Sequence, residues 1–311
     1  MRSGKKAIAA WLALLVLCAL VTACGTGGRS NADPAPATPQ ISENAVISYL
    51  GPEGTYTEEA ARFFFAAGTF QPKETVDDAI ADVTTGAADY AVIPQENTLG
   101  GAVTNYIDAL IAQQDVYVVG EVILPINQTL MGVPGASLED VQTICSHAQG
   151  IAQSAAWRSE HLPDAVTEEM ASTAAAASFV AETGDRTIAA IAAPGAAELY
   201  GLSVLAENVQ ITDANKTRFY VLSASPLEGN HGVFVASCEA NRIDDIIVEI
   251  HNAGAELVTI HDRPEGSGLG VYNYILEVEG ISDKLLKAIE TFPEVTYLGS
   301  FPVMEKQSQG K

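Results

Sequence analysis

The chain has 311 residues, and its 39 acidic and 16 basic side chains give a formal net charge of −23. Such a surface repels nucleic acids and anionic lipid headgroups, so neither is predicted as a partner. The four cysteines and five histidines show no zinc-type spacing, and the sequence predicts no metal site and no cofactor.

The first predicted element is an export signal over residues 1–23. Arg2, Lys5 and Lys6 precede an apolar run that is shorter than the roughly 20 residues of a membrane-spanning helix. The run ends in Val21-Thr-Ala-Cys24, which resembles a bacterial lipobox and would make Cys24 the lipid-carrying first residue. We therefore expect an extracytoplasmic lipoprotein, anchored to the bacterial cell membrane, whose net charge falls from −23 to −26 when the three signal cations are removed. An ordinary cleaved signal, in which Cys24 is incidental, is the alternative.

Residues 24–44 are rich in small residues and proline without apolar periodicity, which predicts a flexible linker. From residue 45 to 225, short apolar runs alternate with helical patterns, and this predicts an α/β domain with a mainly parallel sheet. The expected strands cover 45–50, 90–93 and 141–145, and the expected helices cover 58–67, 101–112 and 149–161.

Four polar stretches follow predicted strands and open predicted helices, at 51–57, 96–101, 146–149 and 172–174. Thr75 and Ser172 are predicted N-caps, because a hydroxyl can accept from free first-turn amides. Ligands bind at such ends in open α/β sheets, where those amides and the helix dipole attract anions. The stretches together predict a polar cleft.

Residues 229–304 follow a different order. Strands are expected over 233–237, 257–261, 272–279 and near 297–301, with helices over 243–252 and 283–292, the second capped by Ser282. This βαββαβ order is typical of a ferredoxin-like domain. Cys145 and Cys238 lie in the two different domains and are predicted to be buried free thiols.

Taken together, the motifs resemble the prephenate dehydratase family over residues 47–302. They are Gly51-Pro-Glu-Gly-Thr-Tyr-Thr57, Pro94-Gln-Glu-Asn-Thr98, Ser146-His-Ala-Gln149, Ser172-Thr-Ala174, Ala196-Ala-Glu-Leu-Tyr-Gly-Leu202 and Asn215-Lys-Thr-Arg-Phe219, in family order. The resemblance implies a two-lobed catalytic domain, similar to periplasmic solute-binding proteins, followed by an ACT regulatory domain. It also implies two crossings between the lobes, which we place near 113–122 and 205–216.

The implied reaction converts prephenate to phenylpyruvate in phenylalanine biosynthesis. Loss of carbon dioxide from the ring supplies the electrons that expel hydroxide, and the ring becomes aromatic. Such a reaction needs orientation and a proton donor for the departing oxygen rather than a strong nucleophile. The family's Thr-Arg-Phe motif implies that Thr217 is this donor.

Arg218 is expected to anchor the pyruvyl carboxylate through a bidentate pair, with its guanidinium and the Thr217 hydroxyl facing one crevice. Glu96 completes the predicted catalytic set, as a group that orients a neighbour. Phe219 is expected in the core or in the cleft wall. The predicted substrate-binding residues are Thr55, Asn97, Thr98, Ser146, His147, Gln149, Ser172, Thr173, Asn215 and Phe219.

The C-terminal domain departs from the family pattern. Asn241-Arg-Ile-Asp244 stands where the family has Gly-Ala-Leu-Val, and His261-Asp-Arg-Pro264 stands where it has Glu-Ser-Arg-Pro. The corresponding regulatory positions are Asn241, Ile243, Asp262 and Arg263. Loss of a glycine at a close approach of backbone to ligand obstructs binding, so we expect weak or absent inhibition by phenylalanine.

Two alternatives stay open at this stage. A lipid-anchored receptor could use the same cleft to capture a carboxylate or an amino acid, although the intact Thr217–Arg218 pair favours an enzyme. An arogenate dehydratase would use the same residues on the amino analogue of prephenate. The expected partners are the small dicarboxylate substrate and a second copy of the chain in a homodimer, and contact with the membrane is expected only through the lipid anchor.

Overall fold

The computed structural model describes residues 42–113 and 115–307. The predicted signal peptide, Cys24 and most of the predicted linker lie outside the described residues. No helix in the described part of the chain is both long and apolar enough to cross a membrane.

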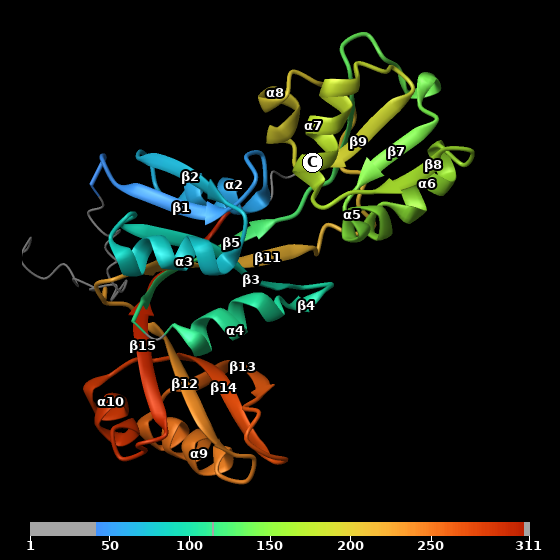
Figure 1. Ribbon diagram of the computed structural model, residues 1–311. Coiled ribbons are helices and arrows are strands. Elements are labelled where there is room, and N and C mark those ends of the chain that lie inside the picture. The colour runs from blue at the N-terminus through green and yellow to red at the C-terminus, as the bar shows by residue number, and fades with distance from the viewer. Residues whose placement is uncertain (1–41, 114, 308–311) are drawn as a thin grey trace, which may run out of the picture. The chain divides into compact units, whose positions relative to one another are not determined.

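A mixed sheet forms the first lobe, in the order β16-β5-β11-β3-β1-β2, and the short β4 pairs with β3 (Figure 1). Helix α2 covers one face, where it packs on Val122, Phe219 and Val221, and helices α3 and α4 cover the other. Its strands are β1 (Val46–Leu50), β2 (Thr69–Lys73), β3 (Tyr90–Asn97), β4 (Gly101–Ala102), β5 (Tyr117–Pro125), β11 (Lys216–Ser223) and β16 (Val303–Glu305). Its helices are α2 (Tyr56–Phe64), α3 (Val76–Thr85) and α4 (Thr104–Ala112).

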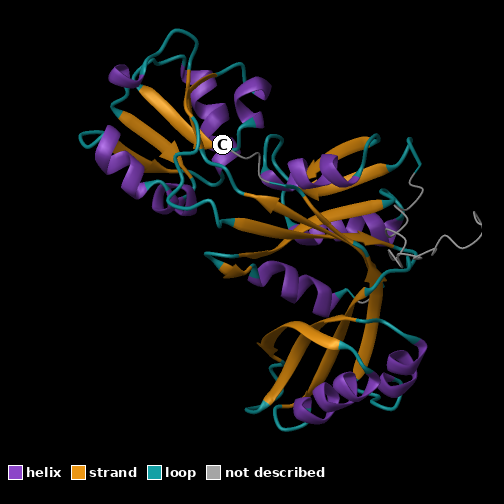
Figure 2. Ribbon diagram, turned by 180° about the vertical axis from the view of Figure 1, so that it is seen from behind, coloured by secondary structure: helices purple, strands orange, loops and turns teal. Residues whose placement is uncertain are grey.

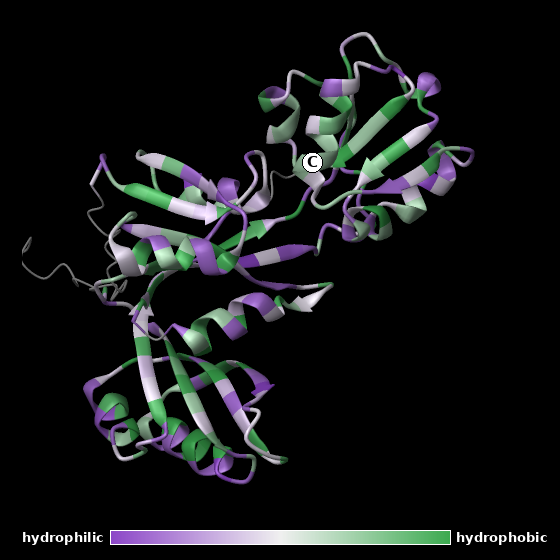
Figure 3. Ribbon diagram, viewed as in Figure 1, coloured by the Kyte–Doolittle hydropathy of each residue, from purple (hydrophilic) through white to green (hydrophobic). Residues whose placement is uncertain are grey.

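The second lobe has its own five-stranded sheet, in the order β10-β6-β9-β7-β8. The central strand β9 is hydrophobic along its length, whereas the edge strand β8 is exposed and hydrophilic (Figure 3). The strands are β6 (Thr129–Gly132), β7 (Thr143–Ser146), β8 (Val166–Glu169), β9 (Ile188–Ala192) and β10 (Ser203–Ala206). The helices are α5 (Ala148–Gln153), α6 (Ala155–His161), α7 (Thr173–Thr183) and α8 (Gly195–Leu199), with a 3₁₀ turn at Leu138–Asp140.

The chain crosses between the lobes at residues 126–128 and again at 207–215. The second crossing lies where it was predicted, but the first prediction, at 113–122, is wrong because β5 pairs with β11 over residues 117–125 of the first lobe. The prediction of a mainly parallel sheet is confirmed for strand direction, since β1, β2, β3, β5 and β16 all run the same way. The returning strand β11 enters between β3 and β5 and runs antiparallel to both, so the sheet is mixed.

The C-terminal domain has the predicted βαββαβ order, and its antiparallel sheet has the ferredoxin-like arrangement β13-β14-β12-β15. Helices α9 and α10 cover one face of this sheet (Figure 2). The opposite face contributes Val233, Val235 and Ile275 to the hydrophobic core of the first lobe. The elements are β12 (His231–Glu239), α9 (Ile243–Ala253), β13 (Glu256–Pro264), β14 (Val271–Glu279), α10 (Asp283–Ile289) and β15 (Val295–Phe301).

Local predictions from single side chains are confirmed. The hydroxyls of Thr75, Ser172 and Ser282 accept from the backbone amides of Asp78, Ala175 and Leu285, at 3.1, 2.9 and 3.3 Å. Cys145 and Cys238 are both buried and free.

After Pro302 the chain returns from the C-terminal domain to the first lobe, where β16 pairs in parallel with β5.

Candidate active site

Strand β11 presents neighbouring residues to different surroundings. Phe219 and Val221 lie in the core under α2, whereas Tyr220 and Leu222 lie in the core shared with the C-terminal domain. Because side chains of a strand alternate between faces, Thr217 lies on the α2 face and Arg218 on the face of the C-terminal domain.

On the α2 face, Thr217 is paired with Asn97 of β3. The Asn97 side-chain nitrogen donates to the Thr217 hydroxyl oxygen at 2.9 Å and to the Asn215 side-chain oxygen at 2.8 Å. The Asn97 side-chain oxygen accepts from the backbone amides of Leu99 and Gly100, at 3.0 and 2.9 Å. Since only the oxygen of an amide can accept these bonds, the orientation of the Asn97 side chain is determined.

This orientation has a chemical consequence for Thr217. The Asn97 nitrogen can only donate, so the Thr217 hydroxyl oxygen is the acceptor in their contact. The Lys216 carbonyl, 3.1 Å from the same nitrogen, is a further acceptor for its two hydrogens. The hydroxyl hydrogen of Thr217 is then available to donate to a third group. A donor held in this way is what a departing hydroxide requires.

The network continues into the second lobe through α5. Gln149 donates from its side-chain nitrogen to the Asn97 oxygen at 3.0 Å, and Asn215 donates to the Gln153 oxygen at 3.0 Å. Gln128, in the first crossing, also donates to the Gln153 oxygen, at 3.1 Å. Both lobes and both crossings therefore meet around the Asn97–Thr217 pair.

Glycines allow this close approach. A Cβ atom at Gly100 would lie 3.0 Å from the Gln149 side-chain nitrogen, and one at Gly150 would lie 2.4 Å from the Ser146 hydroxyl oxygen. The second contact is too short for any real side chain. Gly150 therefore lets α5 pack against the end of β7, with Gln149 directed at Asn97.

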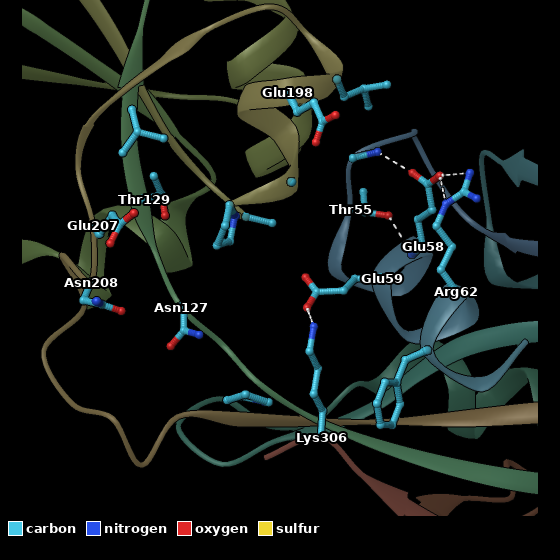
Figure 4. Close-up of a pocket in the computed structure, with 18 of the residues that line it drawn as sticks. Thr55, Glu58, Glu59, Arg62, Asn127, Thr129, Glu198, Glu207, Asn208 and Lys306 are labelled. Atoms are coloured by element: carbon cyan, nitrogen blue, oxygen red, sulfur yellow. Dashed lines mark hydrogen bonds and ion pairs between the residues drawn. The ribbon is translucent and has the colours of Figure 1, made fainter. Parts of the chain in front are cut away.

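A cavity of about 1350 Å³ opens between α2, the two crossings and the first turn of α8 (Figure 4). Thr55, Asn127 and Thr129 are among its polar lining residues. This volume exceeds the roughly 300–1,000 Å³ of common ligand sites. Helix α2 lines the cavity and also covers the sheet face that carries Thr217, so Thr217 and the cavity lie on the same side of the sheet.

The cavity lining is acidic. Its described residues include Glu198 and Glu207, and its two cations are each paired with a lining glutamate. Arg62 lies 2.7 Å from Glu58, and Lys306 lies 2.8 Å from Glu59. A carboxylate ligand must therefore be held mainly by neutral donors and backbone amides.

On the opposite face of the sheet, Arg218 binds three carboxylates. Its Nε and Nη2 donate to the two oxygens of Glu121, and Nη2 also lies 2.6 and 2.7 Å from the oxygens of Glu277. Nη1 lies 3.3 Å from Glu96. The Glu121 and Glu277 side chains are at most 1% exposed, and that of Arg218 is 14% exposed, so this is a buried ion cluster.

Glu121, Glu277 and His231 also bring potential metal-ligand atoms within 4.8 Å of one another. The guanidinium of Arg218 already lies against both carboxylates and supplies the cation that they require.

A sequence model of the family described as prephenate dehydratase matches residues 47–226. The chain belongs to the prephenate dehydratase family. It is 34% identical to the bifunctional chorismate mutase/prephenate dehydratase of Neisseria gonorrhoeae, over 82% of this chain and 74% of that protein. It is 33% identical to the prephenate dehydratase of Amycolatopsis methanolica, over 82% of this chain and 88% of that protein.

Solved structures agree. The prephenate dehydratase of Arthrobacter aurescens in complex with L-Phe matches with a TM-score of 0.74 and 32% identity, over 82% of this chain and 89% of that one. GqqA, described as a novel type of quorum quenching acylase, matches with a TM-score of 0.75 and 27% identity, over 83% of this chain and 98% of that one. The fold is thus shared by proteins with different described activities, and the function must be argued from the site.

Several predicted residues of the dehydratase motifs do converge. Asn97, Gln149, Asn215 and Thr217 are joined by hydrogen bonds. Thr55 lines the cavity and caps α2, His147 caps α5, and Ser172 caps α7 immediately before Thr173. Thr98 ties the β3–β4 turn to the start of β11, because its hydroxyl accepts from the backbone amide of Lys216 at 3.0 Å.

The other predicted site residues have different outcomes. Ser146 is fully buried, and its hydroxyl donates to the Ile191 carbonyl at 2.7 Å inside the second lobe. Phe219 is 1% exposed and lies in the core, one of the two places expected for it. Arg218 does not share a crevice with Thr217, since adjacent residues of a strand point to opposite faces. Glu96 lies on the Arg218 face and contacts Arg218 at 3.3 Å, in agreement with the prediction that it orients a neighbour.

Two of the four regulatory positions, Ile243 and Arg263, form contacts within the protein, as does the neighbouring Arg242. Arg242, the cap residue between Asn241 and Ile243, pairs with Glu294 at 2.8 Å and lies over the Phe292 ring at 4.9 Å. Ile243 is buried in the core of the C-terminal domain. Asn241 and Asp262 are exposed. Arg263 forms a bidentate pair with Asp108 of α4, at 2.6 and 3.0 Å.

The sequence analysis missed Glu121 and Glu277. Each is an acidic residue whose neighbours in a β-strand are strongly apolar, in Val118-Val-Gly-Glu-Val-Ile and Ile275-Leu-Glu-Val. An acidic residue in such a run is rarely buried unless it is paired. An acidic residue within an apolar strand was therefore the sequence pattern that could have predicted these buried ion pairs.

The ion cluster perturbs the acid–base behaviour of its members. Burial raises the pKa of Glu121 to about 7, against the attraction of Arg218. Burial alone would raise the pKa of Glu277 too, but the contact with His231, the charge of Arg218 and hydrogen bonds from Tyr220 and Gln95 lower it. The Glu277 carboxylate, 3.5 Å from the His231 ring nitrogen Nδ1, raises the pKa of His231. The two buried carboxylates share one guanidinium, and Glu121, which has fewer hydrogen-bond donors than Glu277, holds its proton more tightly.

These shifts predict a pH-dependent stability. Near pH 7 the folded state binds more protons at Glu121 and His231 than the unfolded state does, so the free energy of unfolding should rise as the pH falls from 8 to 6.5. Burial lowers the pKa of His261, which partly opposes this trend as the pH approaches about 6.5, the ordinary value of histidine. We expect an increase of about 1 kcal/mol between pH 8 and 6.5, measured by urea denaturation. Glu121→Gln should flatten most of it, and a wild-type stability that rises with pH in this window would contradict the assignment.

Proposed function

We propose that this member of the prephenate dehydratase family converts prephenate to phenylpyruvate at the Asn97–Thr217 pair, outside the cytoplasm. The observation that carries the proposal is the hydrogen bond from the Asn97 side-chain nitrogen to the Thr217 hydroxyl oxygen. It leaves the hydroxyl hydrogen of Thr217 available to donate to a third group.

The reaction assigns a role to each part of the site. Prephenate loses carbon dioxide from its ring carbon, and the electron pair of that bond enters the ring. The bond to the ring hydroxyl breaks as this happens, and Thr217 donates a hydrogen bond to the departing oxygen, with water as the source of the proton. Asn97, Asn215 and Gln149 hold the hydroxyl in place, and orientation supplies much of the rate enhancement.

The substrate carboxylates require donors other than Arg218, whose guanidinium faces the C-terminal domain. We assign them to first-turn amides of α2 and α7, of which the cap hydroxyls of Thr55 and Ser172 accept from only one each. The first turns of α2 and α7 also carry Thr57 and Thr173. Neutral donors suit the ring carboxylate, because a tight ion pair would stabilise the group that must leave.

A substrate comparison tests the proposal. The chain from Asp33 onward is incubated separately with prephenate, arogenate and an N-acyl amide at neutral pH, and product formation and melting temperature are measured. Phenylpyruvate from prephenate is expected. Phenylalanine formed faster from arogenate would assign the amino analogue instead, and hydrolysis of the amide alone would assign an acylase activity. A raised melting temperature without any product would support a receptor.

The location is a separate part of the proposal, and the sequence of the N-terminus supports it. Val21-Thr-Ala-Cys24 follows an apolar run with basic residues before it, so lipid attachment at Cys24 is expected to hold the protein at the bacterial cell membrane. Cys24→Ala should move the protein from the membrane fraction to the soluble fraction. An unchanged distribution between the two fractions would refute the lipid anchor.

A homodimer is also proposed, through the C-terminal domain. Strand β13 is an edge strand of its sheet, and it exposes Val258 and Ile260 to 41% and 39%. Edge strands with apolar side chains favour pairing with a second copy. Sedimentation equilibrium should give twice the mass of the chain, and a monomer at micromolar concentration would contradict the dimer.

Phenylalanine is expected to have little effect on this protein. The turn at Asn241, where the family pattern has glycine, is followed by Arg242, which forms its own contacts with Glu294 and Phe292. We expect a Kd for phenylalanine above about 1 mM. At about 1 mM phenylalanine, inhibition should then be less than about twofold and the melting temperature should not rise. Inhibition or thermal stabilisation at submillimolar phenylalanine would show that an effector site is retained.

A further inference from the structure

Glu277 lies in the C-terminal domain, yet its hydrogen bonds go to both strands that carry the proposed active site. Its oxygens accept from Arg218 of β11, at 2.6 and 2.7 Å, and from the Tyr220 hydroxyl of the same strand at 2.8 Å. Oε2 also accepts from the side-chain nitrogen of Gln95 of β3, at 3.1 Å. Glu277 itself is fully buried.

These contacts lie next to the residues of the site along each strand. Arg218 follows Thr217, and Gln95 precedes Asn97 by two residues. A change in the separation of β11 and β3 would therefore alter the 2.9 Å hydrogen bond between Asn97 and Thr217. Glu277 bonds to both strands from the opposite face of the sheet.

The pairing of β3 with β11 is weakest at this point. Arg218 pairs with Glu96 and Phe219 pairs with Pro94, so Gln95 has no opposite residue and forms a bulge. Pro94 has no N–H group to donate to the ladder. Such a bulge disrupts the ladder and bends its strand locally, and the side-chain bonds of Glu277 hold the two strands together here.

We propose that Glu277 is a positioning residue for the dehydratase reaction, through which the C-terminal domain sets the distance between Asn97 and Thr217. The inference rests on the proposed function of that pair. It assigns the C-terminal domain a role in catalysis that needs no effector. This role explains why the chain keeps the C-terminal domain although the effector-binding pattern at Asn241–Asp244 is lost.

Glu277→Gln in the full chain is the informative variant. Glutamine keeps the shape and part of the hydrogen bonding, and Arg218 remains paired with Glu121, so the cluster keeps a balanced charge. We expect kcat to fall on the order of 10–100-fold and KM to change less than about threefold, because a misplaced donor affects the transition state more than substrate binding. Asp108→Asn is the matched control, since it breaks the exposed Arg263–Asp108 pair across the same domain boundary without touching β11. Its kcat should stay within about twofold of wild type.

Hydrogen exchange gives a second readout that does not depend on activity. Peptides covering 90–98 and 216–223 should exchange faster in Glu277→Gln and at the wild-type rate in Asp108→Asn. Wild-type kinetics and exchange in Glu277→Gln, or equal losses in both variants, would overturn the inference.

If wild-type protein makes no phenylpyruvate, the proposed function fails, and the exchange comparison alone decides the role of Glu277. If Glu277→Gln does not fold, Tyr220→Phe, which removes one bond to Glu277 and no charge, should lower kcat about 3–10-fold, and an unchanged kcat would again overturn the inference.

Discussion

Replacing Arg218 by methionine is expected to lower the free energy of unfolding by about 3–5 kcal/mol, because the change leaves two buried carboxylates without their cation. Glu121 and Glu277 are both almost fully buried, and each has Arg218 as a direct ion-pair partner. Methionine fills a similar volume, so the loss reports on charge rather than on packing. Urea denaturation at pH 8 measures it.

Lys216→Met is the control for the loss of a positive charge on the same strand. Lys216 pairs with Glu305, and both side chains are about 40% exposed, so we expect less than about 1 kcal/mol. The loss of unfolding free energy caused by Arg218→Met should become smaller as the pH falls from 8 to 5.5. Protonation then neutralises the buried carboxylates, and the folded state binds protons that the unfolded state lacks. Equal losses for the two variants at pH 8 would show that Arg218 does not compensate buried charge.

Thr217→Val should lower kcat for prephenate about 10²–10³-fold, the usual effect of removing one donor to a developing negative charge. KM should change little, because the bond to the departing oxygen strengthens only as that oxygen leaves. The fold should tolerate the change. Valine is close in shape and suits a strand, and the Asn97 nitrogen keeps its bonds to the Asn215 side chain and the Lys216 carbonyl.

Thr217→Ser separates the hydroxyl from the methyl group in this prediction. Serine keeps the donor and should retain activity within about tenfold of wild type, whereas valine should not. Steady-state kinetics of the three proteins, with melting temperatures measured alongside, provide the comparison. If valine and serine lose activity equally, the shape of the side chain matters and the hydroxyl is not the donor.

Much of the fold could be predicted from local patterns. The apolar runs at 45–50 and 272–279 lie in β1 and β14, and Thr75, Ser172 and Ser282 cap the helices that they were expected to cap. These features depend on a few adjacent residues. The first crossing was misplaced because the pairing of β5 with β11 joins segments about 100 residues apart, and no local pattern reports it.

The candidate site likewise has a part that local motifs predicted and a part that they did not. Asn97, Gln149 and Thr217 converge as their motifs predicted. The position of Arg218 could have been predicted better, since two adjacent residues of a strand cannot face one crevice. Its partner Glu277 lies 59 residues further along the chain in another domain, and only its burial in an apolar strand indicated a paired charge.

The most direct measurement of the central claim is the turnover of prephenate by the intact wild-type chain, with carbon dioxide and phenylpyruvate both quantified. We predict equal amounts of the two products, formed far faster than in a matched solution without protein. Prephenate recovered unchanged, or consumed only at the rate of that solution, would contradict the account.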